Sequence, residues 1–312
     1  MQRSTFRCIS VVRLGATLLL LSSFTLGTAQ GECDGRLVEH AMGSTCVPEE
    51  PQRVVVLDTG ELDSSLALGV TPVGAVTAFA DGGFPSYLDG RTEGIEVVGT
   101  IAEPNLEAIL ALDPDLILSS RLRHEAIYQQ LSSIAPTVFT ETVGVVWKEN
   151  LLANSEALGL REEAEQLLAD YDERLATLRS ELDELPSVSI VRFLPGQIRI
   201  YLSESFIGTI IEDAGLPRPP SQRAEDFALY VDKEGIALMD ADVMFVTTYG
   251  PAEDTAEQEF RSDPLWNSLD VVQRGDVHGV PDSYWMLGIG PVAANLVVDD
   301  LFTYLMDGDS GQ

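Results

Sequence analysis

The sequence predicts an α/β protein made of two lobes that one long helix joins. Short apolar runs alternate with helical stretches from residue 53 to residue 139, as in a sheet built from βαβ units. Between 147 and 185 the strand signal almost vanishes, and from 188 the alternation resumes. A chain of 312 residues is long enough for two such lobes.

The first lobe is expected over residues 30–146. Its strands are predicted where short apolar runs occur, at 53–57, 72–76, 95–98, 115–118 and 137–139. Helices are predicted between them, at 60–68, 104–110 and 124–133. Pro104 supports the second of these helices, because proline is favoured in the first turn, where its missing N–H leaves no hydrogen bond unmade.

The linker is expected over 147–185 and contains the long helix. Apolar side chains recur there at steps of three and four, at Leu168, Tyr171, Leu175, Leu178, Leu182 and Leu185. A helix from Arg161 to this last leucine has about 25 residues and would measure roughly 37 Å, enough to span two lobes. Pro186 then ends the helix.

The second lobe is expected over 186–312. Strands are predicted at 188–191, 198–201, 242–246 and 276–280. Helices are predicted at 206–214 and 291–306.

Residues 1–29 have the features of a cleaved signal peptide. Arginines precede the apolar run 14–26, and small residues follow it at 27–29. The residues before Cys33 do not fit a lipid-attachment site, so we expect a soluble periplasmic protein.

Cys33 and Cys46 form an even pair in an oxidising compartment, so we expect a disulfide. Residues 36–40 and 44–47 could pair as a hairpin that brings the two sulfurs across from each other. Two free thiols or a metal pair are the alternatives, and the sequence has no His/Cys cluster to support the second.

The chain is strongly acidic, with 19 Lys and Arg against 50 Asp and Glu and a net charge of −31. Such a surface repels nucleic acid, which we exclude as a partner. A saline habitat explains the acidity at least as well as any function does. Because cations are scarce, the position of each one is informative.

Several motifs together resemble the iron-siderophore class of ABC transporter substrate-binding proteins. They are RVVVLD at 53–58, ELD at 61–63, GVTPVG at 69–74, VGT at 98–100, PNLE at 104–107, LDPDLI at 112–117, RHE at 123–125, APT at 135–137 and DPLW at 263–266. The resemblance implies two Rossmann-like lobes, a rigid connecting helix and a ligand cleft between the lobes. It also implies a monomer that delivers a ferric siderophore to the permease of an ABC importer.

The expected ligand is an anionic ferric siderophore of the citrate, hydroxamate or carboxylate type, and we expect no resident cofactor or metal site. A cobalamin or haem carrier of the same fold is one alternative. A protein that reuses the fold for interaction, without a small ligand, is another.

An anionic ligand needs guanidinium groups, and four arginines follow or occupy predicted strands. Arg121 and Arg123 come after 115–118, at the strand end where open α/β sheets bind ligands. Arg192 ends the first strand of the second lobe, and Arg199 lies on the next. The competing interpretation is that each arginine pairs with a surface carboxylate.

Three aromatic residues, Trp147, Tyr249 and Trp285, are candidate cleft walls because they lie near element ends rather than within strands. Core packing is the alternative for each, and it is our expectation for Tyr284. We expect His124 to make structural hydrogen bonds at a helix start, not to bind iron.

The chain has no Gly-x-Ser-x-Gly, His-Glu-x-x-His or P-loop motif, and no Gly-x-Gly-x-x-Gly after a strand, so we expect no catalytic residues. Its three histidines also equip it poorly as a zinc or manganese carrier. By motif, the family resemblance implies that Glu107 and Glu212 dock onto basic residues of the permease. Ordinary solvated surface is the alternative for both.

Overall fold

The computed structural model describes residues 33–78 and 82–306. The predicted signal peptide, 1–29, lies outside the described residues. Within these ranges no helix combines the length and the apolar character needed to cross a bilayer. The two lobes belong to one compact unit that begins at Cys33.

The first lobe contains a five-stranded parallel sheet, which confirms the predicted α/β class. Its strands are ordered β5-β4-β3-β6-β7, with bounds β3 Val54–Val56, β4 Gly74–Thr77, β5 Glu96–Thr100, β6 Leu116–Ser120 and β7 Thr137–Thr140. The strands read as unbroken apolar runs because helices cover both faces of a parallel sheet. The helices are α1 Thr59–Ala67, α2 Leu106–Ala111, α3 Arg121–His124 and α4 Tyr128–Ser132, with 3₁₀ turns η1 Ser86–Leu88 and η2 Glu125–Ile127.

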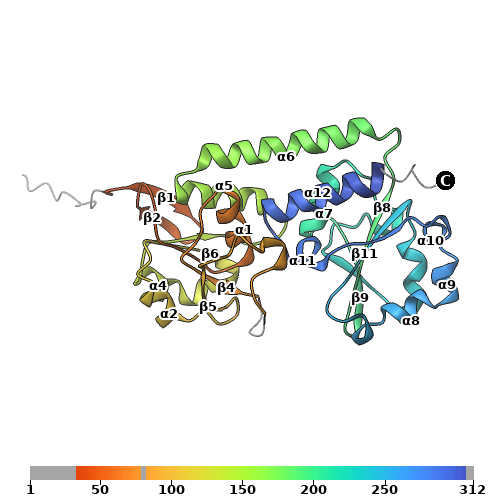
Figure 1. Cartoon of the computed structure of the whole chain (residues 1–312), viewed down its shortest axis with the longest axis horizontal. Helices are drawn as coiled ribbons and strands as arrows, with labels where there is room; N and C mark the ends of the chain where they lie inside the picture. The colour runs from red at the N-terminus through yellow and green to blue at the C-terminus, as the bar shows by residue number, and fades with distance from the viewer. Residues whose placement is uncertain (1–32, 79–81, 307–312) are drawn as a thin grey trace, which may run out of the picture. The chain divides into compact units, whose positions relative to one another are not determined.

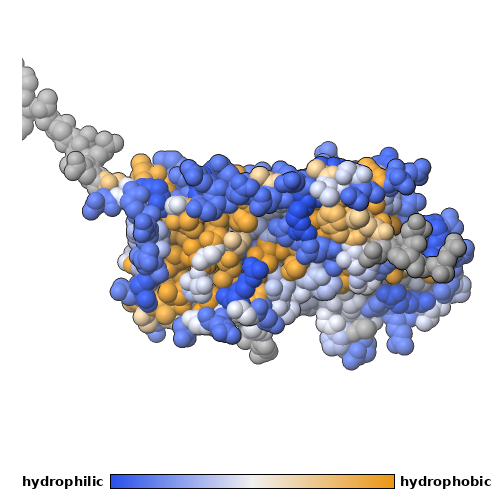
Figure 2. All heavy atoms as spheres, turned by 45° about the horizontal axis from the view of Figure 1, so that its top comes forward, coloured by the Kyte–Doolittle hydropathy of each residue, from blue (hydrophilic) through white to orange (hydrophobic). Residues whose placement is uncertain are grey.

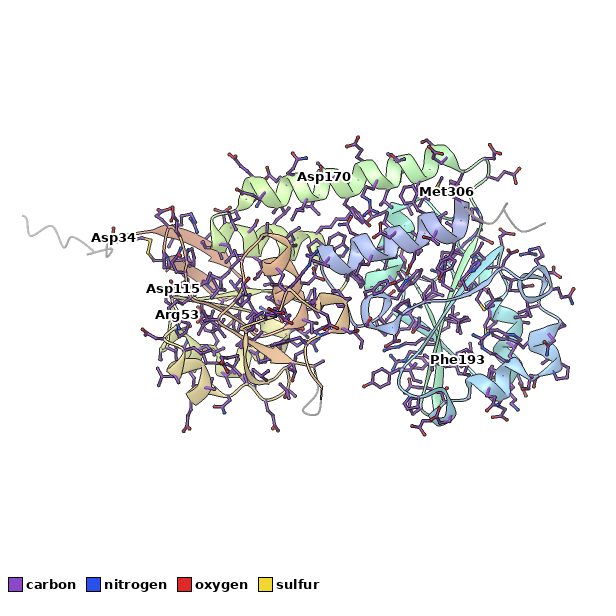
Figure 3. The ribbon with its side chains drawn as sticks, in the orientation of Figure 1. Asp34, Arg53, Asp115, Asp170, Phe193 and Met306 are labelled. Carbon is purple, nitrogen blue, oxygen red and sulfur yellow. A yellow bond between two sulfur atoms is a disulfide. The ribbon has the colours of Figure 1, made fainter. Side chains whose placement is uncertain are left out.

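An N-terminal hairpin of β1 (Arg36–His40) and β2 (Gly43–Val47) packs beside β7. The predicted disulfide between Cys33 and Cys46 is confirmed, with Cα atoms 5.6 Å apart (Figure 3, yellow bond near Asp34). Thr45 Oγ1 donates to the Thr137 carbonyl at 3.2 Å, which fastens the hairpin to the sheet.

Replacing both cysteines by serine is expected to lower the free energy of unfolding by about 3 kcal/mol, because the disulfide restricts the unfolded chain. Guanidinium unfolding of the oxidised protein and of the variant measures the difference. Equal midpoints would contradict the prediction, and the reduced wild-type protein is the control because it should match the variant.

Two helices form the linker, α5 (Trp147–Leu158) and α6 (Arg161–Glu181), and Gly159 separates them in a left-handed conformation. The predicted start of the long helix is confirmed, but its predicted end is wrong. The helix stops at Glu181, Leu182 is extended, and Leu185 is 41% exposed. Figure 1 shows α6 beside α5 and α12, both of which it contacts.

The second lobe has a mixed sheet ordered β10-β9-β8-β11-β12. Its strands are β8 Val188–Leu194, β9 Gln197–Tyr201, β10 Ala228–Val231, β11 Val243–Thr248 and β12 Val277–Gly279. Strand β11 pairs in parallel with both β8 and β12, whereas β9 pairs antiparallel with both β8 and β10. Only Pro195 and Gly196 separate β8 from β9, and so short a loop can join only antiparallel strands.

Helices and 3₁₀ turns make up the rest of the regular structure of the second lobe. They are α7 Phe206–Asp213, η3 Pro220–Gln222, η4 Lys233–Met239, η5 Ala252–Asp254, α8 Glu257–Arg261, α9 Pro264–Asn267, α10 Asp270–Arg274, α11 Asp282–Trp285 and α12 Pro291–Met306. Figure 2 shows hydrophilic residues over much of the visible surface, with a hydrophobic area on the first lobe.

The last helix, α12, is anchored on the first lobe as well as on the second. The carboxylate of Asp63 on α1 accepts hydrogen bonds from the backbone N–H groups of Val292 and Ala293 at 2.8 and 3.1 Å. A side chain on Gly290 would lie 2.5 Å from Asp63, so this approach requires glycine. Helix α12 is therefore a second connection between the lobes, in addition to α6.

Candidate functional site

Two adjoining cavities lie where the lobes meet, and they share Arg123, Met286 and Ile289. The larger, of about 800 Å³, is mostly apolar. We call it the apolar cavity; its lining includes Phe84, Pro85, Ile101, Leu122, Met286 and Ile289. The smaller, of about 280 Å³, is the arginine cavity, lined by Arg123, Arg192, Arg199, Tyr201, Glu204 and Phe227 among others.

Arg192 lies on β8, two residues before the end of the strand, and is buried. Its Nε and Nη2 donate to the two carboxylate oxygens of Asp282 at 2.7 and 2.6 Å, and its Nη1 donates to the Tyr201 hydroxyl at 3.1 Å. The ring of Tyr249 lies 5.1 Å from the guanidinium carbon. These contacts hold the guanidinium in place but also neutralise its charge.

Arg199 lies two residues before Tyr201 on β9, on the same face of the strand, and is half-buried. Its Nε donates to Gln197 Oε1 at 2.9 Å, and its guanidinium stacks over the ring of Tyr230 at 5.3 Å. Among the described residues it forms no ion pair. Arg199 therefore brings to the cavity a positive charge that is not engaged in an ion pair.

Arg123 comes from the first lobe and lines both cavities. Its Nε donates at 2.7 Å to Asp58 Oδ2, while Asp58 Oδ1 caps α1 by accepting from the Thr59 N–H at 2.7 Å. Asp58 is fully buried, whereas the Arg123 side chain is 37% exposed. Arg123 is thus positioned by α1 and faces the cleft.

A buried carboxyl group, that of Glu61, lies close to this ion pair. Its Oε1 accepts from Thr140 Oγ1 at 3.5 Å, and its Oε2 has no partner within the described protein. Burial, and then the negative charge of Asp58, raise the pKa of Glu61 to about 8. The group is therefore mostly uncharged at neutral pH.

The prediction that Trp147 forms a cleft wall is wrong. Its ring is 2% exposed and packs edge-on against Tyr171 and Phe206, and its Nε1 donates to Thr209 Oγ1 at 3.2 Å. As the first residue of α5, it faces the core between the linker helices and α7.

Trp285 is also buried rather than an exposed wall. It borders the arginine cavity, but its ring packs on Phe245 and its Nε1 donates to Asp300 Oδ2 at 2.7 Å. Tyr284 donates to the same carboxylate oxygen at 2.8 Å and packs against the core, as expected. Trp285 therefore lies beneath the cavity as part of the core.

Arg121 is not brought to either cavity. Its guanidinium pairs with Glu141, and its side chain is 43% exposed. His124 makes the expected structural hydrogen bonds, from Nε2 to the Ile101 carbonyl at 2.7 Å and between Nδ1 and Ser119 Oγ at 2.6 Å. Both ring nitrogens are therefore occupied.

The sequence analysis missed the aromatic side of the arginine cavity. The rings of Tyr201 and Phe227 meet edge-on at 5.2 Å, and Tyr230 supports Arg199. The alternation of a strand places residues 199 and 201 on one face, a signal that could have found Tyr201. Phe227 precedes β10 and Tyr230 lies on it. This strand was not predicted, although its run Ala228–Val231 is apolar and could have indicated it.

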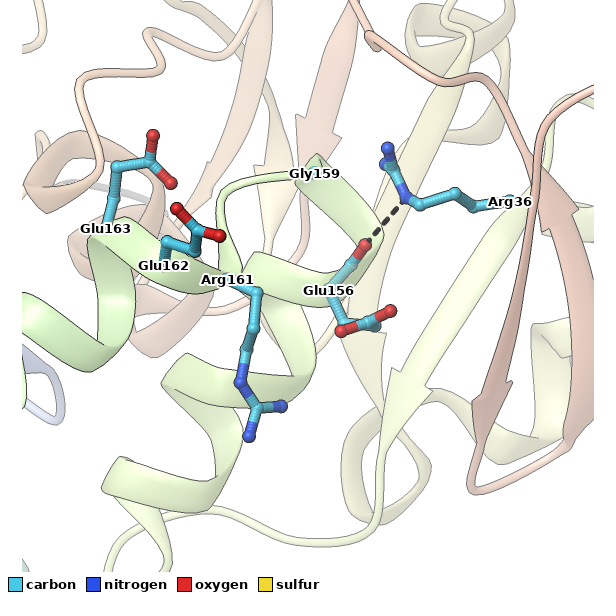
Figure 4. A pocket seen from close by; sticks show the side chains of 6 residues that line it. All are labelled: Arg36, Glu156, Gly159, Arg161, Glu162 and Glu163. Atoms are coloured by element: carbon cyan, nitrogen blue, oxygen red, sulfur yellow. Dashed lines mark hydrogen bonds between the residues drawn. The ribbon is translucent and has the colours of Figure 1, made fainter.

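The cavity drawn in Figure 4, of about 320 Å³, lies at the junction of α5 and α6. Its Arg36 donates from Nε to the Glu156 carbonyl at 3.2 Å and from Nη2 to the Ala157 carbonyl at 3.1 Å. A side chain on Gly159 would lie 2.5 Å from Arg36. The guanidinium therefore satisfies backbone carbonyl groups at the carboxyl end of α5, which is a structural role.

No group of three or more metal-ligating side chains occurs in the part of the chain that the structure describes.

Glu107 on α2 and Glu234 on η4 occupy equivalent places in the two lobes. Each is exposed and follows by two residues a side chain that caps its helix: Asn105 accepts from the Glu107 N–H at 3.1 Å, and Asp232 from the Glu234 N–H at 3.0 Å. The two elements lead into β6 and β11, which are the fourth strands of their sheets in matching order.

Further along the same segments, Asp115 and Asp242 also correspond. The Asp115 carboxylate accepts from the backbone N–H groups of Gln52 and Arg53 before β3 (Figure 3), and the Asp242 carboxylate accepts from that of Ser187 before β8. Glu212 lies instead near the end of α7, a helix that begins after β9. The expectation that Glu212 matches Glu107 in position is therefore wrong.

Comparison with known proteins gives concordant results. The family model described as periplasmic binding protein matches residues 54–284. A probable siderophore-binding lipoprotein of Bacillus subtilis, YfiY, is 40% identical over 87% of this chain and 88% of its own. The achromobactin-binding periplasmic protein of Dickeya dadantii is 33% identical over 80% and 85%.

Among solved structures, SirA of Staphylococcus aureus complexed with staphyloferrin B superposes with a TM-score of 0.78. It is 34% identical, and the match covers 86% of this chain and 98% of that one.

Proposed function

Since this chain belongs to the periplasmic binding protein family, we propose that it captures a ferric siderophore in the cleft between its lobes and delivers it to an ABC importer. The observation that carries the proposal is the meeting of Arg123, Arg192 and Arg199 at one cavity. They come from both lobes of a protein with a net charge of −31. Guanidinium groups are the side chains best suited to carboxylate and other oxygen-rich ligands.

The names of the relatives support a siderophore as the ligand. SirA was solved with staphyloferrin B, and another relative is named for achromobactin. A haem carrier is less well supported, because among the described lining residues there is no histidine or tyrosine in the apolar cavity, where a macrocycle would fit.

We also propose that the protein is a monomer exported to the periplasm. The features of residues 1–29 support export, and the Dickeya dadantii relative is named as periplasmic.

Replacing Arg199 by Gln is expected to weaken binding of an anionic ferric siderophore by about 2 kcal/mol, because the one guanidinium of the cavity that forms no ion pair is lost. Quenching of tryptophan fluorescence during titration measures the affinity. Arg121→Gln is the matched control, since it changes the net charge equally outside both cavities. If the two variants bind alike, this assignment of the site fails.

Arg192→Ala is a poorer test of ligand binding. It would leave the Asp282 carboxylate buried without its partner, so lost stability would accompany lost affinity.

For delivery, we propose that Glu107 and Glu234 contact basic residues of the permease, one from each lobe. This proposal is supported by their position, because both side chains are exposed and both lie at the start of corresponding helices. Glu212 stays a candidate by motif alone.

A further inference from the structure

Two of the three arginines in the cleft already have a carboxylate partner. Arg123 is paired with Asp58 at 2.7 Å, and Arg192 with Asp282 at 2.6 Å. Both carboxylates are largely shielded from solvent, with side chains 0% and 13% exposed. An ion pair that solvent does not screen keeps its charges matched, so these arginines offer N–H donors but little net charge.

The remaining charges also nearly cancel. Arg199 is unpaired, and Glu204 lies at the exposed rim of the arginine cavity. The described lining of the apolar cavity carries no charged residue except Arg123. The cleft as a whole is therefore rich in hydrogen-bond donors and close to neutral, inside a protein whose overall field repels anions.

We propose that Asp58 and Asp282 set the charge selectivity of the cleft, so that it favours uncharged or monoanionic ferric siderophores over trianionic ones. This inference rests on the proposed function and specifies its substrate class. Each hydroxamate bound to ferric iron contributes one negative charge, whereas each catecholate and each doubly deprotonated α-hydroxycarboxylate contributes two. Trihydroxamate complexes are therefore uncharged, complexes of two hydroxamates with one α-hydroxycarboxylate are monoanionic, and tris-catecholate complexes are trianionic.

The charge state of Glu61 fits this balance. Because burial keeps this carboxyl mostly protonated at neutral pH, it adds no negative charge beside Asp58 and Arg123. Both arginines line the arginine cavity while their net electrostatic field stays small. A trianionic complex would have to be held by Arg199 alone.

Three ferric complexes test the proposal: an uncharged trihydroxamate, a monoanionic mixed hydroxamate–hydroxycarboxylate and a trianionic tris-catecholate. We expect the protein to bind one of the first two at least about tenfold more tightly than the third at physiological ionic strength. Asp282→Asn keeps the shape of the side chain and removes its charge. This variant is expected to lower the ratio of these affinities, that of the preferred complex to that of the tris-catecholate complex, by about tenfold.

Glu259→Gln is the matched control, because it changes the net charge equally but lies in a surface pair with Lys233. Should Asp282→Asn unfold, as thermal denaturation would reveal, Asp58→Asn gives the same test, since Asn caps a helix as well as Asp does. Preferential binding of the tris-catecholate complex, or equal shifts in variant and control, overturns the charge selectivity while leaving siderophore capture intact. Failure to bind any of the three complexes, and also a ferric carboxylate-type siderophore titrated beside them, overturns the proposed function itself.

Discussion

Reversing Glu107 and Glu234 together to arginine is expected to abolish growth on the ferric siderophore as sole iron source. Two like charges would then face each other across the contact with a basic permease surface, at a cost of several kcal/mol. Both side chains are exposed and lie outside both cleft cavities, so siderophore affinity and thermal stability should be unchanged. Growth under iron limitation and titration of the purified variant are the measurements.

The pair Glu107→Arg with Glu212→Arg is the matched control, because it makes the same change in net charge. We expect this pair to transport no worse than Glu107→Arg alone, since Glu212 has a different place in its lobe. Normal growth of the Glu107 and Glu234 pair at normal expression would contradict the assignment. If only the control pair abolished growth, Glu212, which the motif indicates, would be the residue that contacts the permease, and Glu234 would not.

Replacing Glu61 by Gln is expected to stabilise the protein by about 3 kcal/mol at pH 7 to 8, a rare direction for a change at a buried position. Burial raises the pKa of Glu61 to about 8 in the folded protein. Its contribution to stability is therefore fully present below the unfolded value, near 4.5, and is lost as the pH rises toward 8. Gln has the shape of the protonated acid and does not titrate, so the variant avoids this loss.

Urea unfolding from pH 2.5 to pH 8.5 measures the effect as a gap in unfolding free energy between the two proteins that is near zero below pH 4 and widens as the pH rises. Asp242→Asn provides a control of opposite sign. The hydrogen bonds from Ser187 lower the pKa of Asp242, so its stabilising contribution is present at neutral pH and lost in acid. A gap for Glu61→Gln that does not vary with pH would refute the titration of Glu61.

Most of the fold could be predicted because the strands of a buried parallel sheet are recorded locally, as short apolar runs. β10 was not predicted although Ala228–Val231 is apolar, because a run of four residues is too short for its periodicity to distinguish a strand from other structure. The end of the long helix was overestimated because apolar spacing continues to Leu185, although the backbone leaves the helix at Leu182.

The sequence by itself determined the α/β class, the disulfide and the placement of Arg123 after a strand and of Arg192 and Arg199 on strands. Strand ends can be located from local patterns, because periodicity depends on neighbours along the chain. Only the tertiary structure decided which residues balance those charges. Asp58 lies 65 residues before Arg123, and Asp282 lies 90 residues after Arg192, and nothing in the local pattern links them.

The same reason explains why the sequence did not predict the burial of the two tryptophans or the correspondence of the two exposed glutamates. Residue type and position near an element end did not reveal that Trp147 and Trp285 face the core, because burial depends on elements packed from elsewhere in the chain. Likewise the correspondence of Glu107 with Glu234 emerges from the order of strands in two sheets and from the caps before each helix. Sheet order and packing are properties of contacts through space, which the folded chain alone specifies.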